Sequence, residues 1–408
     1  MLVLAGCQGP GTPGGSGRTD AGASADGGSD AGPTQDGAPD GGADAGCTTA
    51  QTEACSCPTG AAGTQLCVGG IFGPCECGTD GGDMITADAG TMLAPDAGSG
   101  GLGAFNVNPD TVTVSGISAG AFMSVQLLVA YSASIHGAAI VAGGPYDCYQ
   151  GNYNDLSLAE CAEGIGIAND ASKFVSYTNA QASMNTIDPV SNIAGKPIYM
   201  FSGTKDLVIN QSVMNALQSY LLNFTSSSSI TYNNSTAADH AWISPDATNA
   251  CDFLGPPYLN NCSIDMAQVF LTLFYGTLAP RSASPQGTYV QFNQNAYCPN
   301  GSCSSISMDS TAWVYVPAGC AAGDACKLVV VLHGCSSNQE DIGTALIKQS
   351  GVNEWADTND IVVLYPQALN SAQTDCWDFT GYTGANYDLK SAPQMTAIMA
   401  MVHQITSG

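Results

Sequence analysis

Residues 111–120 read Thr111-Val112-Thr113-Val114-Ser115-Gly116-Ile117-Ser118-Ala119-Gly120, and the main prediction of the fold starts from them. Its β-branched first half predicts a strand, and the apolar residues at 121–134 recur with the period of a helix. Between them, Gly116 and Gly120 allow a turn that would be too tight for side chains on both sides of Ser118. A strand, a Gly-x-Ser-x-Gly turn and a helix together predict an exposed nucleophilic serine.

The elements that follow keep the chain order of an α/β-hydrolase, in which this turn is called the nucleophile elbow. We expect strands at residues 137–142, 197–203 and 230–232, and a helix at 211–223. Asp206 comes just after the second of these strands, and His240 follows the third. The order Ser, Asp, His predicts Ser118 as the nucleophile, Asp206 as the acid and His240 as the base.

The small number of histidines supports this choice of base, because the chain has 4. His136 and His403 fall on predicted helices, where an ordinary helix histidine is the better interpretation, and His333 lies in a separate Leu-His-Gly-Cys motif. Asp239 is the alternative acid. Because Asp239 is adjacent to His240 in sequence, it would reach the imidazole only with difficulty.

The second half of the chain contains the oxyanion loop and the strands that an α/β-hydrolase needs and the first half lacks. In most α/β-hydrolases a loop ahead of the nucleophile, often after His-Gly, provides the second oxyanion donor. Here that loop, with strands at 311–317, 327–332 and 361–365 and helices at 342–355 and 392–405, comes after His240. The sequence therefore predicts a circularly permuted α/β-hydrolase with a mostly parallel central sheet and helices on both faces. The alternative, two domains with half a sheet each, would leave an unpaired apolar edge.

The first hundred residues have a different composition. Leu4-Ala5-Gly6-Cys7 resembles a bacterial lipobox and predicts a lipidated Cys7. The apolar stretch before this motif is short for a secretory signal, so the position of the true start codon stays open. We expect a disordered Asp/Gly/Ala linker within residues 1–46, a small Cys-rich module at 47–78, a second linker at 79–104, and the catalytic domain at 105–408. The module is interpreted as a spacer, with a small binding module as the alternative.

Composition excludes several classes of function. Lys and Arg total 8 against 34 Asp and Glu, so the net charge is −26, which excludes a nucleic-acid binder that works through phosphate contacts. The 17 Cys predict an oxidising compartment, outside the cell or on its outer surface. Neighbour pairing would use all ten Cys of the catalytic domain, as 148/161, 251/262, 298/303, 320/326 and 335/376.

The catalytic domain resembles the extracellular poly(3-hydroxybutyrate) depolymerases of the circularly permuted, single-domain type. The resemblance spans residues 105–408. It is carried by Gly116-Ile117-Ser118-Ala119-Gly120 and by residues 143–148 (GGPYDC), 201–206 (FSGTKD), 256–262 (PPYLNNC), 332–335 (LHGC), 355–359 (WADTN) and 376–378 (CWD).

The resemblance implies the same triad and an oxyanion hole made by the backbone N–H groups of Ala119 and Cys335. It further implies that Trp377 lines the substrate crevice; the alternative is a tryptophan of the core or rim. We assign His333 to substrate binding together with Trp377. Cys335 as a nucleophile is disfavoured, because no base lies nearby in the sequence.

These features predict a secreted or surface-anchored serine esterase that hydrolyses a neutral polyester through an acyl-enzyme, without metal or cofactor. We expect no nucleic-acid or protein partner, and a membrane tether through Cys7. A general short-chain carboxylesterase is the nearest alternative, and a non-catalytic surface lipoprotein is the alternative from another class. A poly(aspartic acid) hydrolase is disfavoured, because a domain of net charge −15 should repel a polyanion.

Overall fold

The computed structural model describes residues 101–166, 171–369 and 375–408, together with the backbone of three short strands within residues 52–72. The chain divides into two units, one within residues 2–93 and the other within 94–408. In the first, β1 (Thr52–Ser56), β2 (Ala62–Val68) and β3 (Ile71–Phe72) form an antiparallel sheet in the order β1-β2-β3. Cys7, the predicted linker at 1–46, residues 79–100 of the linker predicted at 79–104, and the side chains of the predicted Cys-rich module lie outside the described residues.

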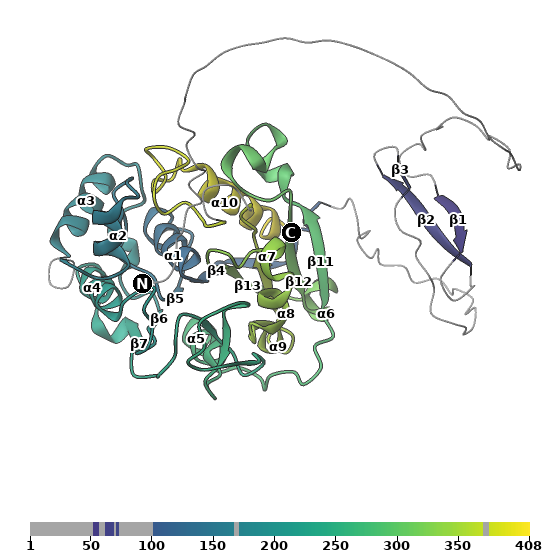
Figure 1. The fold of residues 1–408 in the computed structure, drawn as a ribbon, viewed down its shortest axis with the longest axis horizontal. Coiled ribbons are helices and arrows are strands. Elements are labelled where there is room, and N and C mark those ends of the chain that lie inside the picture. Colours follow the sequence, from purple (N-terminus) through teal and green to yellow (C-terminus); the bar gives the residue numbers. More distant parts are fainter. Residues whose placement is uncertain (1–51, 57–61, 69–70, 73–100, 167–170, 370–374) are drawn as a thin grey trace, which may run out of the picture. The chain divides into compact units, whose positions relative to one another are not determined.

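The larger unit is built on an eight-stranded sheet in the order β11-β12-β14-β13-β4-β5-β6-β7 (Figure 1). Its strands are β4 (Val107–Ile117), β5 (Ala138–Val141), β6 (Ile198–Phe201), β7 (Ile230–Asn233), β11 (Thr288–Asn293), β12 (Thr311–Val316), β13 (Cys326–Leu332) and β14 (Ile361–Tyr365). From β14 to β7 all pairs are parallel, whereas β11 and β12 add an antiparallel edge. The predicted mostly parallel sheet is confirmed.

The centre of the sheet joins the two halves of the sequence. β4 opens the unit, yet it pairs with β13 on one side and with β5 on the other. The N–H of Phe105 donates to the carbonyl of Ile405 at 2.9 Å, so the start of the unit lies against the end of the last helix. Adjacent ends are the condition under which a circular permutation is tolerated. One continuous sheet also contradicts the alternative of two domains with half a sheet each.

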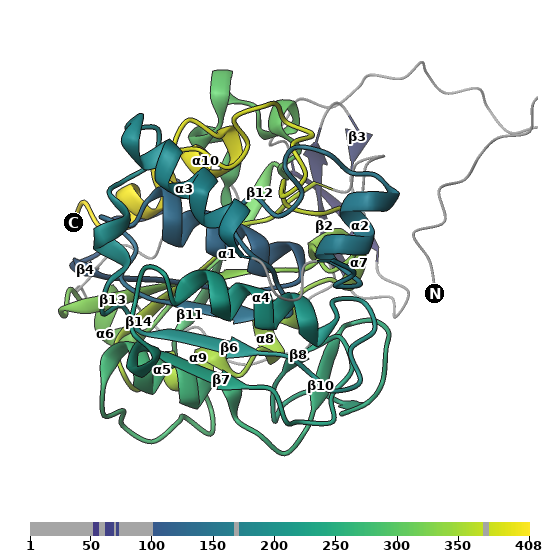
Figure 2. The same cartoon turned by 90° about the vertical axis from the view of Figure 1, so that its left-hand side faces the viewer.

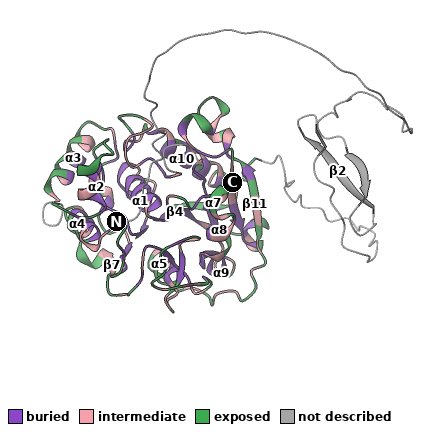
Figure 3. Cartoon of the chain, viewed as in Figure 1, coloured by how far each residue is buried: buried purple, intermediate pink, exposed green. Residues whose placement is uncertain are grey.

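Helices cover both faces of this sheet (Figure 2). On one face lie α1 (Ala119–Ala130), α4 (Gln211–Leu221) and α10 (Pro393–Ile405), and on the other α5 (Met266–Tyr275), α8 (Ala345–Gln349) and α9 (Val352–Ala356). α1 is buried along its whole length because it packs against the middle of the sheet (Figure 3). The remaining helices are α2 (Asp155–Cys161), α3 (Ser172–Ser183), α6 (Ala318–Ala321) and α7 (Gln339–Ile342). None of the helices described here is long and apolar enough to cross a membrane.

Two features of the larger unit bear on the predictions. The helical region expected at 342–355 is divided, because Gly351, with φ +77°, separates α8 from α9. The five expected disulfides are confirmed: they are Cys148–Cys161, Cys251–Cys262, Cys298–Cys303, Cys320–Cys326 and Cys335–Cys376.

Candidate active site

Ser118 occupies the sharp turn between β4 and α1. Its backbone has φ +57° and ψ −122°, a strained conformation for a residue with a side chain, and its N–H donates to Val141 at 2.9 Å. A Cβ atom at position 116 would lie 2.3 Å from the Gly120 carbonyl oxygen, and one at position 120 would lie 2.4 Å from the carbonyl oxygens of Leu332 and His333. Both glycines are therefore required by close backbone contacts.

Asp206 and His240 form a buried hydrogen-bonded pair. His240 Nδ1 lies 2.9 Å from Asp206 Oδ2, and the other carboxylate oxygen accepts the N–H groups of Val208 and Ile209, each at 2.9 Å. Because an ionised carboxylate can only accept, Nδ1 carries the imidazole proton and Nε2 is left as an acceptor. Asp239 instead accepts the backbone N–H of His240 at 2.7 Å, so the structure brings Asp206, and not the alternative acid, to the imidazole.

The two loops that carry this pair are held together by their backbones. The N–H of Thr204 donates to Thr236 at 2.8 Å, and the N–H of Lys205 donates to Ala238 at 3.0 Å. Gly203 allows this approach, because a Cβ there would lie 2.2 Å from the Ala238 carbonyl oxygen. The loops that follow β6 and β7 thus run side by side and place the acid next to the histidine.

Ser118 lies at the same edge of the sheet as this pair. β4, β6 and β7 are parallel, and all three residues come just after the carboxyl ends of these strands, where ligands bind in open α/β sheets. In the described part of the chain no hydrogen bond joins the Ser118 hydroxyl to His240. Catalytic hydrogen bonds are often long before substrate binds, so this geometry is compatible with a serine–histidine–aspartate triad.

The backbone N–H groups of Ala119 and Cys335, the two predicted oxyanion donors, have no acceptor among the described residues. The segment that carries Cys335 touches the serine, because a Cβ built on Gly334 would lie 3.2 Å from Ser118 Cβ. Free N–H groups at a nucleophile are the donors that an oxyanion hole requires.

His333 and Trp377 are buried in this structure, and their predicted contact with substrate stays a prediction. Trp377 is 0% exposed and His333 is 1% exposed. The indole Nε1–H donates to the His333 carbonyl at 3.1 Å, and the ring centroids are 5.1 Å apart. Burial lowers the pKa of His333 to about 4. The burial of Trp377 agrees with the alternative of a core tryptophan, which the sequence left open.

The Cys335–Cys376 disulfide joins the segment after β13 to the segment that carries Trp377. Because its sulfur is in this bond, Cys335 is not available as a nucleophile.

Exposed apolar side chains adjoin the acid and histidine loops, and no pattern in the sequence predicts them. Leu207 is 75% exposed immediately after Asp206, and Phe253 and Leu254 are 46% and 41% exposed. Lys205 Nζ binds Asp252 Oδ2 at 2.6 Å, which brings the two segments together. This small exposed apolar surface lies beside the candidate catalytic groups.

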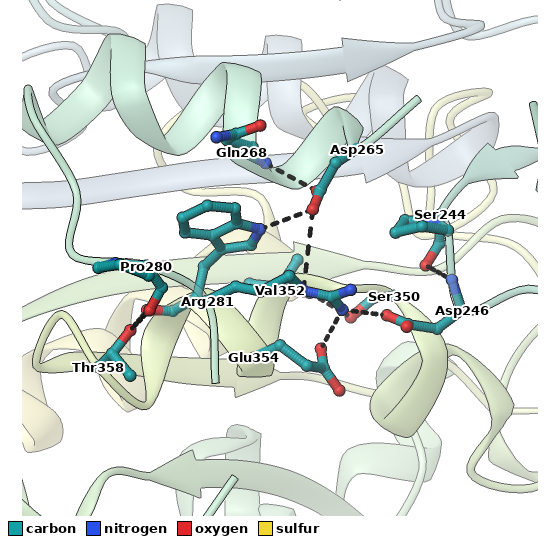
Figure 4. A network of polar contacts seen from close by, with 12 residues as sticks. Ser244, Asp246, Asp265, Gln268, Pro280, Arg281, Ser350, Val352, Glu354 and Thr358 are labelled. Carbon is teal, nitrogen blue, oxygen red and sulfur yellow. Dashed lines mark hydrogen bonds and ion pairs between the residues drawn. The ribbon is translucent and has the colours of Figure 1, made fainter. Parts of the chain in front are cut away.

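Beyond His240 the chain is anchored by an arginine. Arg281 lies among three carboxylates, those of Asp246, Asp265 and Glu354, with the last two at 3.8 and 3.7 Å (Figure 4). Asp246 belongs to the segment that follows His240, whereas Asp265 precedes α5 and Glu354 lies on α9. This network ties the histidine segment to the helices beneath the sheet.

Comparisons with known proteins give consistent matches to one family, although no family model matches the chain. A poly(3-hydroxybutyrate) depolymerase of Delftia acidovorans is 44% identical over 312 residues, 75% of this chain, and the chain spans 62% of that relative's length. A polyhydroxybutyrate depolymerase of Talaromyces funiculosus is 36% identical over 331 residues, covering 75% of this chain and 93% of that relative.

Solved structures agree with these relatives. The crystal structure of the PHB depolymerase from Penicillium funiculosum matches with a TM-score of 0.68 at 35% identity, covering 75% of this chain and 99% of that one. A second structure, of a PHB depolymerase with serine replaced by alanine in complex with an R3HB trimer, matches equally well.

Proposed function

The chain belongs to the poly(3-hydroxybutyrate) depolymerase family, and on that premise we propose that it is a secreted serine esterase that hydrolyses poly(3-hydroxybutyrate)-type polyesters. The observation that carries the proposal is the buried His240–Asp206 pair at the sheet edge where Ser118 occupies the strained turn.

The reaction follows from the proton positions at this site. His240 Nε2 takes the proton of the Ser118 hydroxyl as its oxygen attacks an ester carbonyl, and the same nitrogen then protonates the leaving alkoxide. Asp206 holds the imidazole in the tautomer that leaves Nε2 unprotonated, and it stabilises the imidazolium. The N–H groups of Ala119 and Cys335 stabilise the oxyanion, and water then hydrolyses the acyl-enzyme by the same steps.

A neutral polymer suits the surface around this site. Leu207, Phe253 and Leu254 expose apolar groups beside the acid and histidine loops, and such groups favour contact with an uncharged, water-insoluble chain. The domain carries few cations, and an uncharged polyester needs none for recognition. The R3HB trimer bound to a similar protein supports the same class of substrate.

The proposed location is outside the cell or on its outer surface. The five disulfides support an oxidising compartment. We include in this proposal a lipid anchor at Cys7, linkers at 1–46 and 79–104, and a spacer module at 47–78, which would hold a catalytic domain at 105–408 away from a membrane.

The decisive experiment is clearing of a suspension of amorphous poly(3-hydroxybutyrate). We expect wild-type protein to clear it and Ser118→Ala to lose activity by about 10⁴-fold or more. Ser227→Ala, at an exposed serine far along the chain from the elbow, is the matched control and should clear normally. Cleavage of short nitrophenyl esters without clearing would establish the carboxylesterase alternative, and inactivity on both substrates would favour the binding lipoprotein.

A further inference from the structure

We propose that His333 is a positioning residue of the oxyanion hole: its ring fixes the peptide between Gly334 and Cys335 so that the Cys335 N–H faces the nucleophile. The proposal rests on the function proposed above, because it assigns a task within the same reaction. It also gives a role to a buried histidine that the proposed triad does not use.

Both ring nitrogens of His333 are engaged, and their partners fix the tautomer. Nε2 lies 3.0 Å from the backbone nitrogen of Ala368, which can only donate, so Nε2 accepts. The proton is therefore on Nδ1, which donates to the carbonyl oxygen of Gly334 at 2.7 Å. Burial lowers the pKa of His333 to about 4, so this neutral arrangement persists at neutral pH.

Holding the Gly334 carbonyl also sets the direction of the next N–H. The peptide group is planar and trans, so its C=O and N–H point in opposite directions. A bond to the carbonyl oxygen from the His333 ring turns the Cys335 N–H away from that ring. Glycine would otherwise allow this peptide to rotate with little cost, and a rotated peptide would direct a carbonyl oxygen at the developing oxyanion.

The surrounding contacts hold the His333 ring and the Gly334–Cys335 peptide in place. The Trp377 indole donates to the carbonyl of His333 itself, and the Cys335–Cys376 disulfide ties Cys335 to the segment that carries Trp377. Gly334 lies against Ser118, since a Cβ there would be 3.2 Å from Ser118 Cβ. The peptide set by His333 is thus the one that adjoins the nucleophile.

Two amide substitutions separate the two ring contacts. In His333→Asn the side-chain NH₂ can occupy the place of Nδ1 and donate to Gly334, but the partner of Ala368 is lost. In His333→Gln the amide reaches the place of Nε2 and can accept from Ala368, but the donor to Gly334 is lost. His403→Gln, at an exposed histidine on α10, is the control.

The measurements are kcat and KM on a soluble ester, with active sites counted by mass spectrometry after exhaustive reaction with a serine-reactive fluorophosphonate. We expect His333→Gln to lower kcat per active site by about 10²-fold, as removal of one oxyanion donor does, with little change in KM. The affinity for a boronic acid, which forms a tetrahedral adduct, should weaken in parallel. His333→Asn should retain at least ten times the kcat of the glutamine variant.

Equal losses in the two variants, or a loss confined to KM, would overturn the proposal. The crystal structure of His333→Gln gives a test that does not depend on activity: the peptide between Gly334 and Cys335 should have rotated. An unchanged peptide would refute the positioning role even if the wild type proves inactive on every ester, whereas that inactivity alone would refute the proposed function.

Discussion

Replacing Asp147 with asparagine should raise the free energy of unfolding more at pH 8 than at pH 4. Asp147 follows β5, is 8% exposed, and accepts the Tyr387 hydroxyl at 2.6 Å. Burial, together with the nearby Asp388 carboxylate, raises the pKa of Asp147 from 3.8 to about 7. Asparagine keeps an acceptor for Tyr387, has no charge to bury, and tolerates the φ of +55° at this position.

The sign follows from proton binding. Between pH 4 and 7 the folded protein retains a proton on Asp147 that the unfolded chain has released, so this residue makes the folded state less stable as the pH rises. A rise in pKa from 3.8 to about 7 corresponds to about 4 kcal/mol of destabilisation that is complete above pH 7. Because folded proteins are stable by about 5–15 kcal/mol, the effect is large.

The assay is guanidinium unfolding at pH 4, 6 and 8, with disulfides intact, for wild type and Asp147→Asn. The difference in the free energy of unfolding between the two proteins should grow by about 4 kcal/mol from pH 4 to pH 8. Ser227→Ala, which changes an exposed residue without an ionisable group, is the control and should give a difference that does not change with pH. If the wild-type and Asp147→Asn curves stay parallel within about 1 kcal/mol, the error of the extrapolation, the buried carboxylate does not have the proposed effect on stability.

The remaining predictions concern the site and the close contact beneath it. Asp206→Asn should lower kcat by about 10⁴-fold, because the amide favours the wrong imidazole tautomer. Asp239→Asn should keep a kcat close to that of the wild type. Equal losses of kcat in steady-state assays of the two variants would contradict the assignment of Asp206 as the acid. Gly120→Ala should lower the free energy of unfolding by about 3 kcal/mol, because the new methyl group would lie 2.4 Å from two carbonyl oxygens at the end of β13; unchanged denaturant unfolding would contradict this contact.

Elements with a strong local pattern were predictable from the sequence. The apolar run Ile361–Tyr365 is a strand with the same bounds as expected, since its β-branched residues suit a position buried on both faces. α5 was missed, although Asp265, which caps its first turn, and Gly276 after its end are signals that could have found it. The edge strand β11 was missed because most of its side chains are not buried, and its place is set by pairing with β12.

In the candidate site, too, residues that follow a local pattern were predictable, and those that depend on distant contacts were not. Ser118, Asp206 and His240 follow strand ends in a fixed chain order, so sequence alone selects them. Trp377 could not be placed, because its burial depends on a bond to the backbone of His333, 44 residues earlier. The residues around Trp377 in the sequence do not indicate which distant segment will cover its side chain.

The position of β4 in the sheet has a consequence for how the protein folds. β5 follows β4 closely in the chain, but β13 is synthesised about 200 residues later. During synthesis, the strand that leads to Ser118 therefore has one apolar edge unpaired until about three quarters of the domain has been made. Contacts this distant in sequence slow folding, and an exposed edge invites pairing with other chains. The refolding rate of the protein should therefore be limited by the docking of β13.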